Sequence, residues 1–273
     1  MTHRAAVLGS PVAHSLSPVL HRAAYTHLGL TDWQYDAHDV DEAGLAVFLD
    51  GLDHSWAGLS LTMPLKAAVL PLLDAASPVV EMAGGANTVL LRDGRRVGEN
   101  TDVPGMAAAL TAAGVGVVEE AVLLGGGATG RSALVALAGR TRRVRAYVRD
   151  PARRDGLVAA AAAAGVTLEV EPWARAADGL AAPLVVSTVV AGATDHLVAS
   201  VPRHVGALFE VLYDPWPTPL AAAWVARSAP VVDGLDLLVH QGVLQVLLMT
   251  GVDADPAALV PVLRAAGERA LRA

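Results

Sequence analysis

The chain has 273 residues, enough for one large domain or two of ordinary size, and 53% of them are hydrophobic, which excludes a disordered protein. The net charge of −7 and the lack of a Lys/Arg cluster interleaved with aromatic residues argue against nucleic acid as a partner, and every apolar run is shorter than the roughly 20 residues of a membrane span. With no cysteine there are no disulfides or thiolate metal ligands, and without an N-terminal secretory signal we expect a cytoplasmic protein.

The first hundred residues are predicted to alternate between strands and helices. The pattern predicts strands over 4–10, 33–40 and 56–62, a helix led by Pro18 and ending at His27, and another that begins at Pro64 and runs to about residue 73. Residues 86–100 are typical of two strands turned at Asp93-Gly94, a strong hairpin signal.

From residue 119 the pattern becomes a regular alternation of strands and helices. A helix is expected over 130–139, and an Ala-rich helix is expected to end at Gly165. Two further helices follow, one over 237–250 and one from near Pro256. The expected strands are 121–125, 144–148, 167–170, 184–187, 207–213 and 230–232. Six strands separated by helical segments predict a doubly wound parallel sheet.

A glycine-rich segment, "LLGGGATGRSA", follows the first of these strands. Gly125, Gly127 and Gly130 form a G-x-G-x-x-G arrangement. The motif alone is weak in a chain with 26 glycines, but here it directly follows a strand and opens a helix, as a dinucleotide site requires. We therefore expect a nicotinamide cofactor, and an ordinary strand-to-helix turn is the alternative.

Paired serines near the N-terminus, in "AHSLSPVLH", are candidates for binding a small anion. If this segment is extended, Ser15 and Ser17 point the same way and present two hydroxyls to one carboxylate. The alternative is that Ser17 is a helix N-cap followed by Pro18 at the first helical position. Capping explains Ser17 and Pro18, but it explains neither Ser15 nor His14.

Two further segments carry candidate catalytic groups. "GLSLTMPLK" places Lys66 in the first turn of a helix, where the helix dipole mildly disfavours a cation, so the lysine is either harmlessly exposed or retained for a task. "GENTDVPG" offers Asn100, Thr101 and Asp102 just before another proline-led helix, where a capping role for Thr101 or Asp102 is the alternative.

Taken together, these motifs resemble those of the shikimate dehydrogenase family, nearly end to end. The resemblance rests on the shared order and spacing of seven segments, which are "GSPVAHSLSPVLH", "GLSLTMPLK", "GGANTV", "GENTDVPG", "GGGATGRSA", "YDPWPTPL" and "GLDLLVHQG". It implies an α/β fold with an N-terminal substrate-binding domain, residues 1–104, completed by the C-terminal helices 237–273. A Rossmann NADP-binding domain, residues 105–236, lies between them in the chain.

The resemblance also implies an activity, the reversible NADP-dependent reduction of 3-dehydroshikimate to shikimate in aromatic amino-acid biosynthesis. The enzyme would be an oxidoreductase acting on a CH-OH group, with the small-molecule substrate as its partner and either a monomer or a homodimer as its assembly. We expect no metal, because there is no H-E-x-x-H motif and the nine histidines show no ligand-like spacing.

The family's site residues carry over position by position. Lys66 and Asp102 would be catalytic, flanking the hydroxyl that is oxidised. The substrate-binding residues would be Ser15 and Ser17 on the carboxylate, Tyr213 near the carboxylate and the nicotinamide, and Ser60, Thr62, Asn87 and Gln241 around the ring and its hydroxyls. The cofactor-binding residues would be Gly125, Gly126, Gly127, Ala128, Thr129, Gly130, Arg149, Arg153, Thr188 and Gly234.

The chain departs from the family's pattern at a few positions. Ser60 stands where the family usually has asparagine, and Asp236-Leu237 replaces a common Gly-Met pair. Asp150 lies 20 residues after Gly130 and favours NAD, whereas the arginines at 149, 153 and 154 favour NADP, which is our prediction with NAD possible. The alternatives are a quinate or aminoshikimate dehydrogenase using NAD, and a non-catalytic shikimate-binding paralogue.

Overall fold

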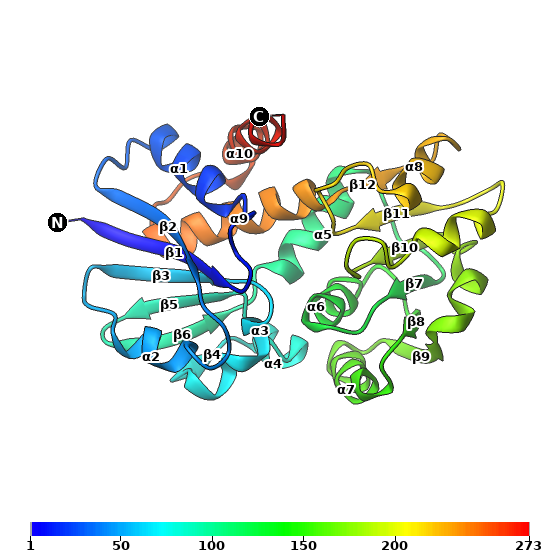
Figure 1. The fold of residues 1–273 in the computed structure, drawn as a ribbon, viewed down its shortest axis with the longest axis horizontal. Helices are drawn as coiled ribbons and strands as arrows, with labels where there is room; N and C mark the ends of the chain where they lie inside the picture. The colour runs from blue at the N-terminus through cyan, green and yellow to red at the C-terminus, as the bar shows by residue number, and fades with distance from the viewer. Residues whose placement is uncertain (1, 273) are drawn as a thin grey trace. The chain divides into compact units, whose positions relative to one another are not determined.

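The computed structural model describes residues 2–272 and divides into two compact units (Figure 1). The first contains the chain up to Thr101 together with the segment from Leu238 onward, and the second contains Asp102–Leu237. The boundaries expected from the sequence, at 104/105 and 236/237, lie within three residues of these breaks.

The first unit is built on a mixed six-stranded sheet with the order β2-β1-β3-β5-β6-β4. β1 pairs in parallel with β2 and β3, whereas β5 runs antiparallel to both β3 and β6. The strands are β1 (His3–Gly9), β2 (Trp33–Asp39), β3 (Trp56–Leu61), β4 (Ala75–Ala76), β5 (Thr88–Arg92) and β6 (Arg95–Glu99). The predicted hairpin is confirmed, since Asp93 (φ 52°) and Gly94 (φ 71°) both have the positive φ that a type I′ turn requires.

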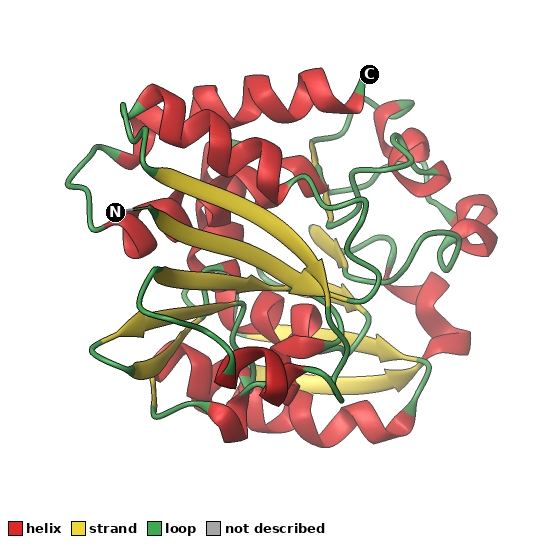
Figure 2. Cartoon of the chain, turned by 60° about the vertical axis from the view of Figure 1, so that its left-hand side comes forward, coloured by secondary structure: helices red, strands yellow, loops and turns green. Residues whose placement is uncertain are grey.

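Helices lie on both sides of this sheet, and α1 packs beside α10 (Figure 2). The helix expected over 64–73 is divided into α3 and a 3₁₀ turn over Leu70–Leu72, because Pro71 has no N–H to continue an α-helical ladder. The short α2 and α4 escaped prediction because six residues show too little periodicity. The helices are α1 (Ser17–His27), α2 (Leu45–Asp50), α3 (Leu65–Ala68), α4 (Pro78–Ala83), α9 (Gly234–Thr250) and α10 (Pro256–Leu271).

The second unit is built on a fully parallel six-stranded sheet with the order β12-β11-β10-β7-β8-β9. Numbered from β7, this is the order 3-2-1-4-5-6 read from the β9 edge, so the predicted doubly wound sheet is confirmed. The strands are β7 (Ala121–Leu124), β8 (Arg143–Val148), β9 (Thr167–Pro172), β10 (Leu184–Ser187), β11 (Ala207–Glu210) and β12 (Val231–Val232). β11 ends at Glu210 rather than at residue 213 because its neighbour β10 ends at Ser187.

The connections of the second unit are α-helices and 3₁₀ turns. Gly165 ends α7 in the left-handed conformation (φ 68°), as predicted from its place after the Ala-rich run. The helices are α5 (Asp102–Ala112), α6 (Ala128–Ala136), α7 (Arg154–Ala164) and α8 (Pro219–Val225), and 3₁₀ segments cover Pro151–Arg153, Trp173–Gly179 and Asp195–Ser200. Among residues 2–272, no helix combines the length and the apolar character needed to cross a membrane.

A buried carboxyl group joins the ends of β10 and β11. Glu210 is 0% exposed and accepts hydrogen bonds from the hydroxyls of Thr218 and Ser187, the latter at 3.4 Å. Thr218 in turn caps α8 by accepting from the Ala221 N–H at 3.0 Å. Burial raises the pKa of Glu210, and the two hydroxyl donors offset only part of that effect.

We expect Glu210→Gln to stabilise the protein at neutral pH. The unfolded chain releases the glutamic acid proton near its ordinary pKa of 4.5, whereas the folded protein holds it to higher pH. The free energy of unfolding therefore falls as pH rises above 4.5, and an amide that cannot titrate avoids this loss. Thermal unfolding of the wild type and of Glu210→Gln at several pH values measures the gain in stability. If the variant has the higher Tm at pH 4 as well, or the lower Tm at pH 7, the raised pKa of Glu210 is not the cause.

Candidate active site

A buried polar cluster lies in the first unit, where β3, β5 and α9 meet. Its members are far apart in sequence and nearly inaccessible to solvent, with exposed fractions of 6% or less. They are Ser60, Asn87, Thr88, Thr101, Gln241 and Gln245. Polar groups buried this deeply are stable only when they are hydrogen-bonded, so their mutual contacts determine how the cluster is built.

Asn87 is the centre of this cluster. Its Oδ1 accepts from the backbone N–H of Thr101 at 2.7 Å, and its Nδ2 donates to Thr101 Oγ1 at 2.9 Å and to Gln241 Oε1 at 3.2 Å. The Thr101 hydroxyl also lies 3.2 Å from Gln241 Oε1. The structure therefore brings together the predicted residues Asn87 and Gln241, which are 154 positions apart.

Ser60 joins the same cluster through contacts with two residues that were not predicted. Its Oγ lies 2.6 Å from the hydroxyl of Tyr35 and 2.8 Å from Oε1 of Gln245. Tyr35 and Gln245 were not among the predicted site residues. The spacing of Gln245 four positions after Gln241 on one helix was the available signal, because residues i and i+4 share a helix face.

The paired serines adopt a geometry different from the one assumed. Leu16 has αR dihedrals (φ −79°, ψ −7°), so the segment is not extended. The alternative of Ser17 as the N-cap is also wrong, since Leu16 occupies the N-cap position and no side chain caps α1. Instead the Ser17 N–H donates to Ser15 Oγ at 3.3 Å, and the Ser17 side chain interacts with the Tyr35 hydroxyl. Ser17 is 6% exposed, at the edge of the buried cluster.

Lys66 lies in the first turn of α3, as predicted. Its backbone carbonyl accepts from the Ala86 N–H at 2.8 Å, which places α3 directly beside the residue that precedes Asn87. Thr62 lies between β3 and this helix. Its N–H donates to the Leu8 carbonyl, and its own carbonyl accepts from the Leu65 N–H. Lys66 is also the single lysine of the chain, whose other 19 basic residues are arginines.

Asp102 begins α5 in the second unit and is 4% exposed. It directly follows Thr101, whose backbone and side chain are fixed on Asn87 in the first unit's cluster. Asn100, just before them, donates to the Gly85 carbonyl at 2.7 Å. The segment that ends in Asp102 is thus held by consecutive hydrogen bonds.

The glycine-rich segment of the second unit follows β7 at the point where the strand order reverses. Gly125 has a φ of 110°, which a residue with a side chain adopts only under strain. Thr188, after the neighbouring strand β10, donates from Oγ1 to the Leu124 carbonyl at 3.1 Å and packs against Gly125. In doubly wound sheets this switch point is where ligands bind, which agrees with the predicted dinucleotide site.

The next two glycines of the motif differ in what surrounds them. A Cβ on Gly130 would lie 2.9 Å from the Gly125 carbonyl oxygen, so α6 packs too closely on the turn to admit a side chain. A Cβ on Gly127 would meet nothing within 4 Å. Ala128 and Thr129 follow in the first turn of α6, whose backbone N–H groups are a favourable environment for phosphate. Packing therefore explains Gly130, whereas the open space at Gly127 fits the close approach of a ligand.

This difference predicts opposite outcomes for two matched substitutions. Gly130→Ala should destabilise the protein by about 1–3 kcal/mol through overpacking. Gly127→Ala should leave the Tm unchanged, because its backbone (φ −73°) suits alanine, and should weaken NADP binding at least about tenfold by keeping the pyrophosphate away. Thermal unfolding and calorimetric titration with NADP separate the two effects. Unchanged NADP affinity in Gly127→Ala would show that this segment is only a turn.

Arginines gather where β8 ends beside the glycine-rich segment. A Cβ on Gly126 would lie 2.9 Å from the Cβ of Arg153, so the two segments touch. Asp150 accepts from the Ala152 N–H at 3.0 Å and lies 3.7 Å from the Arg153 guanidinium. Burial, with the charge of Arg153 as a second cause, lowers the pKa of Arg131 on α6. Two cations this close favour an anion between or beside them.

Comparison with known proteins identifies the family. A shikimate dehydrogenase (NADP(+)) of Thermus thermophilus is 36% identical over 96% of this chain and 98% of its own length. The chain belongs to the shikimate dehydrogenase family. Residues 7–89 match the family model described as the shikimate dehydrogenase substrate binding domain.

Solved structures of this family share the fold. The shikimate dehydrogenase of Mycobacterium tuberculosis has a TM-score of 0.88 and 36% identity, with 96% of this chain and 99% of that one covered. A shikimate 5-dehydrogenase of Thermus thermophilus in complex with NADP(H) and shikimate has a TM-score of 0.82 and 35% identity, with 97% and 100% covered. These similarities confirm the fold and the family predicted from the motifs.

Two remaining predicted site residues of this shikimate dehydrogenase family member follow β11 and β12. Tyr213 lies in the loop after β11 and is partly exposed. Gly234 begins α9, where a Cβ would lie 2.3 Å from the Val211 carbonyl oxygen. Backbone packing therefore explains Gly234 without any ligand. Among residues 2–272 no group of three histidine, aspartate or glutamate side chains is placed to hold a metal ion.

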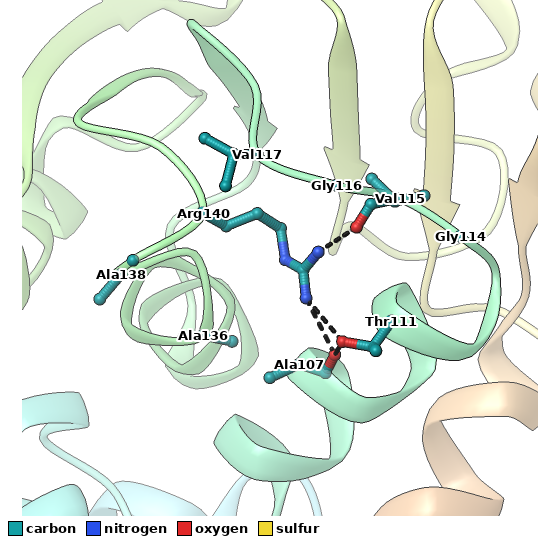
Figure 3. Close-up of a pocket in the computed structure, with 10 residues that line it drawn as sticks. Ala107, Thr111, Gly114, Val115, Gly116, Val117, Ala136, Ala138 and Arg140 are labelled. Atoms are coloured by element: carbon teal, nitrogen blue, oxygen red, sulfur yellow. Dashed lines mark hydrogen bonds between the residues drawn. The ribbon is translucent and has the colours of Figure 1, made fainter.

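A separate pocket of the second unit is lined by α5, the end of α6 and the loop over residues 114–117 (Figure 3). Arg140 points into it, and its guanidinium donates to the carbonyls of Ala107 and Val115 and to the Thr111 hydroxyl. The Ala107 carbonyl and the Thr111 hydroxyl belong to α5, whereas the Val115 carbonyl belongs to the loop that follows this helix. Arg140 therefore joins α5 to the loop, which is a structural role.

Proposed function

We propose that the protein catalyses the reversible NADP-dependent reduction of 3-dehydroshikimate to shikimate. The observation that carries this is the buried assembly of Asn87, Thr101 and Gln241, three residues from separate family motifs, in a chain 36% identical over 96% of its length to a shikimate dehydrogenase (NADP(+)). The first unit would be the substrate domain and the second unit, with its glycine-rich turn, the NADP domain.

The substrate would be held by hydroxyl and amide groups of the first unit. Ser15 and Ser17 would bind the carboxylate. The ring and its hydroxyls would be bound by Ser60, Thr62, Asn87 and Gln241, with Tyr213 beside the carboxylate. The carboxamide of Gln241 has one Nε2 proton engaged by the Leu238 carbonyl at 3.0 Å, which fixes the direction in which the other donates. A hydrogen-bond donor whose direction is already fixed orients the substrate without a further loss of conformational entropy during the reaction.

Lys66 and Asp102 would be the catalytic pair. The Lys66 ammonium would donate a proton to the carbonyl oxygen as it becomes a hydroxyl, and in the reverse direction the amine would take it back. The Asp102 carboxylate would accept a hydrogen bond from the same hydroxyl and orient it. Retention of both groups argues against a non-catalytic shikimate-binding paralogue.

The residues of the second unit fit NADP. Gly125 and Gly127 would admit the pyrophosphate at the N-terminus of α6, Gly130 would let α6 pack closely on the turn, and Arg149 with Arg153 would bind the 2′-phosphate. When bound, the nicotinamide supplies the hydride that reduces the carbonyl carbon. Thr188 supports the glycine turn, so its role toward the cofactor is indirect. We expect the enzyme to be cytoplasmic and to act as a monomer or a homodimer.

A steady-state assay with shikimate or quinate, each with NADP or NAD, tests the proposal. We expect the highest kcat/KM for shikimate with NADP. Preferred turnover of quinate would assign the sister activity, and Ser60, which stands where the family usually has asparagine, is the observation that keeps this second candidate in the assay. The absence of turnover with both substrates and both cofactors would refute the proposal and leave the aminoshikimate dehydrogenase and the non-catalytic paralogue as alternatives.

Ser17→Ala tests the carboxylate site. Since Ser17 does not cap α1, its replacement should leave the Tm nearly unchanged. The loss of one hydrogen bond to a charged group, about 1.5–3 kcal/mol, should appear largely as a raised KM for shikimate. The KM for shikimate and the Tm, measured on the same preparation of Ser17→Ala, separate a binding role from a structural one. A lowered Tm with an unchanged KM would show that the Ser17 hydroxyl serves only to hold Tyr35.

A further inference from the structure

The orientation of one buried side chain, Gln245, is fixed by its surroundings. Its Nε2 lies 3.1 Å from the Asn87 carbonyl oxygen and 2.9 Å from Thr88 Oγ1. A carbonyl oxygen is only an acceptor, so the amide nitrogen and not the amide oxygen must face Asn87. The Thr88 hydroxyl already donates its proton to Asn87 Oδ1 at 2.9 Å, so it can only accept from Gln245. Gln245 is 1% exposed, and turning its amide over would therefore oppose two acceptors in the dry interior.

This orientation sets the direction of the hydrogen bonds on the other side of the amide. Oε1 of Gln245 lies 2.8 Å from Ser60 Oγ and 3.3 Å from Nε2 of His21. An amide oxygen only accepts, so Ser60 donates its proton to it and His21 carries its proton on Nε2. The Tyr35 hydroxyl, 2.6 Å from Ser60 Oγ, must then donate to Ser60.

His21 has the properties of a neutral donor in this arrangement. It is 1% exposed, its ring stacks on Tyr35 with centroids 3.9 Å apart, and its Nδ1 has no hydrogen-bond partner among the described residues. Burial lowers the pKa of His21 to about 3, against a smaller opposite effect of the Gln245 hydrogen bond. His21 is therefore uncharged over the whole range in which an enzyme works.

The Ser60 hydroxyl is left with one unused lone pair and no proton to give. We propose that Gln245 is a positioning residue that makes Ser60 an obligate hydrogen-bond acceptor for a substrate hydroxyl. This inference rests on the proposed function. The reacting oxygen is a carbonyl, and so only an acceptor, in one of the two substrates. Ser60 therefore receives a hydroxyl that keeps its proton in both, which is one that does not react.

The test measures shikimate binding without cofactor, by calorimetry, in single and double variants. Gln245→Met keeps the shape of the side chain and removes its polar atoms, and Ser60→Ala removes the acceptor. Each should weaken the Kd for shikimate about tenfold, and the double variant should lose no more than the weaker-binding single variant, because the two act as one unit. In kinetics the loss should appear in the KM for shikimate and not in the KM for NADP.

Val246→Ala is the matched control. Val246 is adjacent on α9, 0% exposed and purely apolar, so its truncation should lower the Tm and leave the Kd unchanged. Three outcomes would each overturn the inference. Gln245→Met could bind shikimate as tightly as the wild type, or it could lose no more affinity than Val246→Ala. The losses of affinity could also add in the double variant.

A measurement on the wild-type protein does not depend on any variant or on substrate. The ¹⁵N chemical shifts of His21 should show a proton on Nε2 and none on Nδ1, unchanged between pH 8 and pH 5. A proton on Nδ1 would reverse the hydrogen bond to Gln245 and overturn the inference, even if shikimate turnover is normal. If His21 carries its proton on Nε2 as expected but the wild type does not bind shikimate, the proposed function is refuted instead.

Discussion

Replacing Lys66 by methionine should lower kcat about 10²–10⁴-fold while shikimate still binds. In the proposed mechanism Lys66 gives and takes the proton of the alcohol oxygen, and methionine keeps the length of the side chain without a titratable group. Because α3 is held by backbone contacts, including the 2.8 Å bond from Ala86 to the Lys66 carbonyl, the fold should be retained. Stopped-flow and steady-state rates, with a calorimetric Kd for shikimate, measure both parts of the prediction.

The composition of the chain offers a sharper control for this result. Arginine supplies 19 of its 20 basic residues, so a cation needed only for its charge would be expected to be arginine here too. Lysine differs in that its ammonium can give up a proton to a reacting oxygen, which the guanidinium of arginine in a protein does not. Lys66→Arg should therefore bind shikimate well and turn over as slowly as Lys66→Met.

Near-normal kcat in Lys66→Met would refute the acid/base assignment, and recovery of activity in Lys66→Arg would reduce it to a charge effect. Asp102→Asn should also be slow. The double variant Lys66→Met/Asp102→Asn should lose less than the product of the two single losses, because residues that act as a unit are not additive. Since Lys66 is the single lysine, selective ¹⁵Nζ labelling yields one side-chain signal that reports its protonation directly.

Elements whose signals are local were predictable from the sequence. The hairpin at Asp93-Gly94 and the helix end at Gly165 depend on the φ values of one or two residues, and their positions were correct. The parallel sheet of the second unit followed from strand-helix alternation. The division of the helix after Pro64 was missed because periodicity continues across Pro71 although the hydrogen-bond ladder does not.

The contacts around Ser60 in the buried polar cluster could not be found in this way. Ser60 and Gln245 are 185 positions apart, and their contact depends on how α9 packs against β3 and β5. Family motifs identified Asn87 and Gln241, which carry the resemblance, but Tyr35 and Gln245 stand outside those motifs. His21 ends the first motif, yet nothing in the motif indicated its contact with Gln245. Ser17 shows the opposite error, since a sequence pattern ideal for an N-cap is used differently when Leu16 adopts the helical conformation.

Removing the arginines after β8 should shift the cofactor preference from NADP toward NAD. Asp150 lies where an acidic residue could favour NAD, but its carboxylate accepts from the Ala152 N–H and caps the 3₁₀ turn over Pro151–Arg153, and Arg153 lies 3.7 Å away to offset its charge. The last residue of β8, where a discriminating acid would be expected, is the apolar Val148.

Arg149→Ala and Arg153→Ala should each weaken NADP binding by the cost of a charge-assisted hydrogen bond, about 1.5–3 kcal/mol or roughly 10–150-fold, and leave NAD binding nearly unchanged. The expected preference follows from the proposed contact of each guanidinium with the 2′-phosphate, which NAD lacks. Calorimetric Kd values for NADP and NAD, with kcat/KM for each cofactor at saturating shikimate, measure the change in preference. Arg140→Ala is the control, because Arg140 is a cation of the same unit whose guanidinium is bound to Ala107 and Thr111 of α5, so its removal should affect neither affinity. A wild-type preference for NAD, or an equal loss for both cofactors in Arg149→Ala, would show that Asp150 or another contact sets the choice.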